Sequence, residues 1–181
     1  MIRKRDWFWL LFLPLYLTIG TIRHEFSHAL VAHFQGAEIT NFTFWPSIHE
    51  NGIFYLGYVS LRGETSWLVD AAPYLFDIIT YAIFYPLVFF ISYQRHWVWL
   101  NLVVIGVISP IINSLYNYLL GSDVEKMLAA LPDLLVHGSF LLGLGLSLMG
   151  LVLLFRHSRQ SADISDPKQY AMLHMLEDLS T

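Results

Sequence analysis

One short motif in the sequence has residue types and spacing that could do chemistry, His24-Glu25-Phe26-Ser27-His28. On a helix, positions i and i+4 lie on one face about one turn apart, so both imidazoles can bind the same metal ion. Glu25 can then reach the attacking water and act as a general base. Zinc would lower the pKa of that water and polarise a scissile carbonyl. The motif therefore predicts a zinc-dependent peptidase, with His24 and His28 as ligands.

A hydrolytic zinc usually has three protein ligands and one open position, so a third ligand must come from elsewhere. The chain has no cysteine, which excludes thiolate ligands, disulfides and a cysteine nucleophile. The remaining candidates are Asp123, Asp77, Glu125, Asp70, His33 and His49. Asp123 follows Gly121, where the chain can bend after an apolar segment. Asp77 is its main rival, because a carboxylate inside an apolar helix needs a partner. His33 lies too far from His24 along a straight helix to share its metal.

Composition places this motif in a membrane protein. Of 181 residues, 56% are hydrophobic and 13% are charged, whereas about a quarter are charged in a soluble domain. The net charge of −4 is modest and the basic residues are scattered, which gives no indication of nucleic-acid binding. The length fits one membrane-embedded domain over residues 1–156, followed by a polar tail over residues 157–181.

Four apolar segments are long enough to cross a bilayer, which takes roughly 20 residues. They run from about Trp7 to Phe34, from Trp67 to Ser92, from Trp97 to Leu120 and from Leu134 to Phe155. The first follows Arg3-Lys4-Arg5 like a secretion signal, but its length and its Trp- and Phe-rich composition favour a retained helix. The third is expected to break at Ser109-Pro110.

A segment of different composition, residues 38–64, separates the first two apolar segments. It is rich in Ile, Phe, Thr and Tyr, and Asn51-Gly52 is a hairpin signal, so we expect two to four short strands. In the tail, Met172, Met175, Leu176 and Leu179 fall at helical spacing, which predicts a short amphipathic helix, with disorder as the alternative. The expected fold is therefore mainly α: a polytopic membrane protein with about four transmembrane helices and a small membrane-associated β-hairpin or sheet after the first.

Ionisable groups inside a membrane helix are costly and are usually functional. Arg23, His24, Glu25 and His28 together are hard to explain as packing. The alternative is a polar cluster at a helix end, exposed at the membrane interface. The apolar run Ala29-Leu30-Val31-Ala32 continues the helix, so the motif is expected to lie inside it.

This layout resembles the site-2 protease family of intramembrane zinc metalloproteases. Members of that family have HExxH in one membrane helix, a β-rich segment after it, and a metal-binding Asp two helices later. Over roughly residues 7–127, His24, Glu25 and His28 match the motif, and Asp123 matches the later Asp by order and position. The family's usual prolines and Leu-Asp-Gly are absent between Asn113 and Asp123, so the chain resembles a divergent member.

The resemblance implies zinc bound by His24, His28 and Asp123, and cleavage of membrane-associated proteins or peptides. It also implies that Asn113 or Asn117 helps to hold the substrate backbone, with an interhelical hydrogen bond as the alternative for each. The β-rich segment could bind an extended substrate by main-chain pairing at a strand edge, or it could only cap the helices.

Two other functions are weighed against a protease. One is a catalytically inactive, metalloprotease-like membrane protein that binds a partner, although an inactive protein has no need of Glu25. The other is a di-iron membrane oxygenase, which needs several histidine boxes. After His24, His28 and His33, the remaining histidines are scattered singly.

The basic residues predict how the chain is inserted in the membrane, because they prefer the cytoplasmic side of membrane helices. Most of those that flank the four segments fall on one side: Arg3, Lys4, Arg5, Arg95, Arg156, Arg159 and Lys168. Both termini are therefore expected in the cytoplasm, with the motif and Asp123 toward the opposite face. The better-known members of the resembling family have active sites nearer the cytoplasm.

Overall fold

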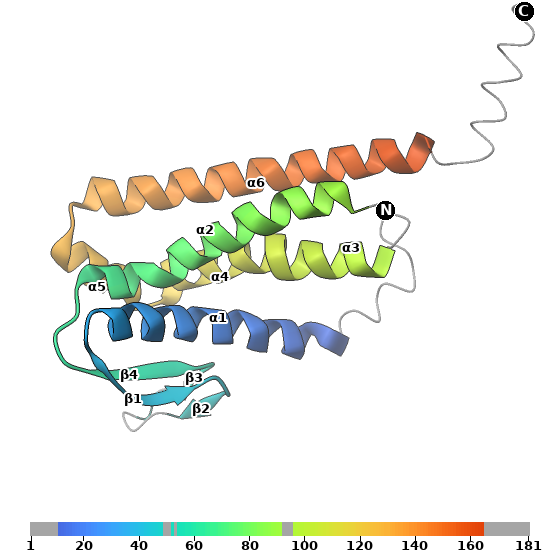
Figure 1. Ribbon diagram of the computed structural model, residues 1–181. Helices are drawn as coiled ribbons and strands as arrows, with labels where there is room; N and C mark the ends of the chain where they lie inside the picture. Colours follow the sequence, from blue (N-terminus) through green and yellow to red (C-terminus); the bar gives the residue numbers. More distant parts are fainter. Residues whose placement is uncertain (1–10, 49–51, 53, 92–95, 165–181) are drawn as a thin grey trace, which may run out of the picture.

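A computed structural model describes residues 11–48, 52, 54–91 and 96–164 (Figure 1). In chain order the elements are α1 (Leu13–Phe34), β1 (Glu38–Thr43), β2 (Ser47–Ile48), β3 (Phe54–Tyr55), β4 (Tyr58–Arg62), α2 (Trp67–Phe90), α3 (His96–Val103), a π-helix (Val104–Ile108), α4 (Ser109–Leu120), α5 (Asp123–Ala130) and α6 (Asp133–Ile164). The predicted class is confirmed, since the described chain is mainly helical with a small β region after the first helix. The predicted amphipathic helix over Met172–Leu179 and the start of the first segment at Trp7 lie outside the described residues.

Three helical segments of the described chain are long and apolar enough to cross a membrane: Trp67–Phe90, Trp97–Leu120 and Asp133–His157. They indicate a membrane protein and match three of the four predicted crossings. The remaining predicted crossing, which is the first in the chain, corresponds to α1, whose 22 residues make about 33 Å of helix. The polar residues in its second half lower its apolar character.

The third predicted crossing is continuous, so the expected break at Ser109-Pro110 is wrong. The chain passes from α3 into α4 through the π-helical segment, and Pro110 occupies the first turn of α4. Pro110 lacks the N–H for one helical hydrogen bond, but the backbone stays helical before it, where the Ser109 N–H bonds the Val104 carbonyl in the π-helical pattern. Gly106 of the π-helix lies against the ring of Phe84 in α2, where any Cβ would overlap that ring.

The helices alternate in direction, and α2 lies between α1 and α6 (Figure 1). α2 contacts α1, α4, α5 and α6. α5 is a short helix that connects α4 to α6 at one end of the bundle, where α1 also ends and α2 begins (Figure 1). The second half of α1, the start of α2 and α5 therefore come together, although they are distant in the sequence.

The β region forms two antiparallel pairs and lies along α1 (Figure 1). β1 pairs with β4 from Glu38↔Arg62 to Thr43↔Tyr58, and β2 pairs with β3. Gly52 of the hairpin signal follows β2 and precedes β3 in the sequence, and it has a positive φ of 78°, which glycine adopts readily.

Gly57, between β3 and β4, allows the β region to lie close to α1. A Cβ at this position would be 2.8 Å from the carbonyl oxygen of Thr43 and 3.2 Å from Cγ of Glu25. Real Cβ atoms do not come that close to a backbone oxygen, so a side chain here would push β4 away from α1. The glycine therefore sets the distance between β4 and the second half of α1.

Candidate metal centre

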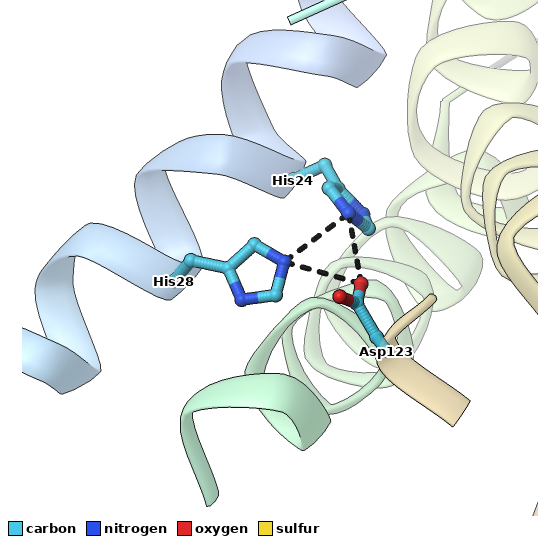
Figure 2. Close-up of side chains that lie close together, drawn as sticks. All are labelled: His24, His28 and Asp123. Carbon is cyan, nitrogen blue, oxygen red and sulfur yellow. Dashed lines mark hydrogen bonds and ion pairs between the residues drawn. The ribbon is translucent and has the colours of Figure 1, made fainter. Parts of the chain in front are cut away.

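The side chains of His24, His28 and Asp123 converge at the end of the bundle where α1 and α5 meet (Figure 2). Asp123 Oδ2 lies 3.4 Å from Nε2 of His24 and 3.2 Å from Nε2 of His28. The two Nε2 atoms are 3.3 Å apart. Three ligand atoms from two distant elements thus form a nearly equilateral triangle.

This triangle fits a zinc ion. Zinc binds His nitrogen and carboxylate oxygen at about 2.0–2.2 Å, usually with tetrahedral geometry. The edge of a tetrahedron is about 1.6 times the distance from its centre to a corner, so ligand atoms around zinc lie roughly 3.3 Å apart. The three distances of 3.2–3.4 Å agree with that edge. Three protein ligands also leave the fourth position open, as hydrolytic sites require.

The three groups are held away from bulk water. His24, His28 and Asp123 are exposed to only 8%, 7% and 8%. Burial raises the pKa of the Asp123 carboxyl, but hydrogen bonds and charges from the two histidines outweigh burial and hold that pKa below its ordinary value. The carboxylate therefore stays ionised at neutral pH, as a metal ligand must.

Residues outside the cluster contact two of its members, His28 and Asp123. Nδ1 of His28 lies 2.8 Å from the main-chain oxygen of Val69 in α2. Nζ of Lys126 lies 3.8 Å from the other oxygen of Asp123 and 3.2 Å from a carboxylate oxygen of Asp70. Outer contacts of this kind orient metal ligands and tune their basicity.

The other predicted ligand candidates do not join this group. Asp77 is paired with Arg23 at 2.8 Å, and its second oxygen accepts hydrogen bonds of 2.8 Å from Asn113 and from Ser114. Asp70 is occupied by Lys126. Glu125 and His33 are exposed, and His49 lies outside the described residues. Among the described residues, His24, His28 and Asp123 are the one group of this kind that could hold a metal.

The ion pair between Arg23 and Asp77 explains two of the ionisable groups inside the helices. Asp77 is 3% exposed and its two oxygens accept from α1 and α4. A carboxylate inside an apolar helix is tolerated when it is paired and hydrogen-bonded in this way. The partner that the sequence required for Asp77 is therefore a guanidinium, and the pair connects three helices beside His24.

Asn113 and Asn117 lie against the far side of the His24 ring. Their Nδ2 atoms are 3.5 Å and 3.4 Å from Nδ1 of His24. Asn113 also bonds Asp77, and Asn117 bonds the main-chain oxygen of Asn113 at 2.9 Å. Both asparagines of α4 therefore make interhelical contacts, which were the alternative to substrate binding for each of them.

Glu25 lies beside the cluster and borders the same cleft. It is buried, with 8% exposed, and its carboxylate accepts a hydrogen bond from the backbone of Val59 in β4. The cleft has a volume of about 640 Å³ and is bordered by the cluster, by β4, by the end of α4 and by both asparagines. The Glu25 carboxylate, the candidate ligand group and a cleft thus come together in one place.

The sequence did not reveal two contributors to this site, the Val69 carbonyl and Lys126. A main-chain oxygen leaves no trace in residue types, and a lone lysine in a loop or short helix looks like an ordinary surface residue. Comparison with known proteins adds no relative, because no family model, curated protein or solved structure matches this chain.

Proposed function

We propose that the protein is an intramembrane zinc metalloprotease that hydrolyses peptide bonds of membrane-associated proteins, as a divergent relative of the site-2 proteases. One observation carries the proposal: the ligand atoms of His24, His28 and Asp123 lie within 4.8 Å of one another, with Glu25 beside them. The HExxH spacing accounts for two of these ligands, and the return of the chain through α4 and α5 supplies the third.

The residues have separable roles in this mechanism. Zinc bound by the three ligands would supply a water of lowered pKa and a polarised carbonyl. Glu25 takes a proton from the attacking water and returns it to the leaving amine. Asp123 and the two imidazoles would hold the ion in place. Their burial limits the access of bulk water to the site.

An extended substrate has a place to bind at β4. In the described chain β4 pairs with β1 alone, so no strand covers its other edge. The hydrogen bond from Val59 to Glu25 indicates that this edge faces the catalytic residues. A peptide that adds to the edge by main-chain pairing would lie across the cleft. A helical substrate must unwind locally first, because its peptide groups are otherwise bonded within the helix.

We further propose that α1 is the fourth membrane crossing. Its first half is apolar and exposed, as in Leu13, Leu15 and Leu17, and its length of about 33 Å matches the hydrocarbon core. In its second half, Arg23 pairs with Asp77 of α2, and His24 and His28 face Asp123 of α5. Membrane helices turn such groups inward in this way.

The direct test is the metal content of the purified protein by mass spectrometry. The wild type should contain about one zinc per chain, because the buried donor set fits zinc. His24→Ala should lose it, because one of the three ligands is gone. Iron in place of zinc would favour the di-iron oxygenase, and a wild type that binds no transition metal would leave an inactive, partner-binding protein.

The charge distribution predicts the orientation, with both termini in the cytoplasm and the metal site toward the opposite face. Because the chain has no cysteine, single cysteines report the side of the membrane without background. Thr65→Cys, exposed between β4 and α2, should react with an impermeant thiol reagent on intact cells. Ser158→Cys, toward the other end of α6, should react only after permeabilisation. The reverse pattern would place the site on the cytoplasmic side.

A further inference from the structure

Pro73 lies inside α2 and is among the most deeply buried residues of the described chain. In an α-helix the carbonyl of each residue accepts a hydrogen bond from the N–H four residues later. Proline has no N–H, and its ring crowds the carbonyl four residues earlier. The carbonyl of Val69 is therefore left without its helical donor.

The Val69 carbonyl has a donor from another helix instead. Val69 is 3% exposed, so water cannot readily supply one. Nδ1 of His28 lies 2.8 Å from the Val69 oxygen, across a sequence separation of 41 residues. A buried carbonyl needs a hydrogen bond, and the imidazole of a metal-ligand candidate provides it.

This contact decides which nitrogen of His28 is free. A main-chain oxygen only accepts, so Nδ1 must carry the proton. Nε2 is then the nitrogen left for a metal, and it is the atom that faces Asp123 at 3.2 Å and His24 at 3.3 Å. A histidine held in this way is oriented for metal binding before the metal arrives.

We propose that Pro73 is a positioning residue for the metal centre: by freeing the Val69 carbonyl, it fixes the orientation and tautomer of His28. This inference rests on the proposed metal site. Proline inside a helix is unfavourable for the helix itself. The two prolines of α2 therefore differ, because Pro86 lies about three and a half turns further along the helix, away from the cluster.

The test compares Pro73→Ala with Pro86→Ala in the full-length protein. Alanine at 73 restores an N–H, which competes with His28 for the Val69 carbonyl. Zinc affinity, measured by competition with a chelator, should fall roughly 10-fold, at the lower end of the effect of losing an outer partner. Thermal stability of the metal-free Pro73→Ala protein should stay equal or rise, because alanine favours the helix. Pro86→Ala should leave zinc affinity unchanged.

If Pro73 has only a structural role, Pro73→Ala should lower zinc affinity and thermal stability together. Unchanged zinc affinity in Pro73→Ala would overturn the proposal. Nitrogen-15 NMR of labelled histidine supplies a second readout that needs no variant. Metal-free wild type should show His28 with a proton on Nδ1, and an unprotonated Nδ1 would also overturn the proposal.

These readouts separate the positioning role from the protease function. A wild type that binds zinc, has the expected tautomer and loses affinity in Pro73→Ala would support the positioning role even if it cleaved no peptide. Cleavage together with zinc affinity insensitive to Pro73→Ala would remove the positioning role and leave the protease.

Discussion

Glu25→Gln should abolish peptide hydrolysis while the metal site stays filled. Glutamine has nearly the same shape as glutamate and its carbonyl can still accept the hydrogen bond from Val59, so the buried position remains packed. It cannot accept the proton from the attacking water. A general base typically contributes about 10²- to 10⁴-fold, and correct orientation of the water adds to this. Turnover should therefore fall by at least that factor.

The measurement is cleavage of a membrane-protein substrate in detergent or proteoliposomes, with zinc content determined on the same samples. Glu64→Gln is the matched control, because Glu64 is an exposed carboxylate between β4 and α2, and it should cleave normally. Near-normal turnover by Glu25→Gln would exclude Glu25 as the base and, with it, the proposed protease mechanism.

Asp123→Ala should cause the largest loss of bound metal among the carboxylate variants. Asp123 Oδ2 lies within 3.4 Å of both imidazole nitrogens, and alanine leaves only two ligands. The fall in zinc affinity should exceed the roughly 10- to 100-fold typical of an outer partner. Metal content by mass spectrometry and chelator competition both measure it.

Two variants act as controls for the role of Asp123. Glu125→Ala removes an exposed carboxylate from the same helix and should keep full zinc content. Asp77→Asn tests the rival ligand, and it should keep zinc although it weakens the pair with Arg23. Full zinc content in Asp123→Ala, with loss in Asp77→Asn, would transfer the ligand role to Asp77.

The sequence predicted the parts of the site that follow from local spacing and from the number of crossings. His24 and His28 share a face because four residues make about one turn. Asp123 comes to the same end because the chain runs back through α2 and forward again through α3 and α4, so α1 and α4 end at the same side of the bundle (Figure 1). The pairing of Asp77 with Arg23 was not predictable, because it depends on how α1 and α2 pack across 54 residues of sequence.

The errors at helix boundaries also have physical causes. The change from apolar to polar residues in a sequence predicts where the chain leaves the bilayer, but a helix can continue into the water beyond that point. α6 accordingly runs to Ile164, past the predicted end at Phe155 and into the predicted polar tail. Ser109-Pro110 suggested a break, yet the helix continues through these residues after a π-helical turn. The π-helix before α4 packs against α2, and residue types do not reveal such a contact.

The π-helix determines which residues of α4 face His24. A π-turn contains more residues than an α-turn, because its hydrogen bonds span five residues instead of four. Had the chain continued as α-helix through Val104–Ile108, α4 would be turned by about 100°, the angle of one residue, relative to α3. Trp99 and Val103 could then stay in the core only if Asn113 turned away from Asp77. The π-turn therefore sets the rotation of α4 about its axis, and this rotation determines whether Asn113 can form its hydrogen bonds beside His24.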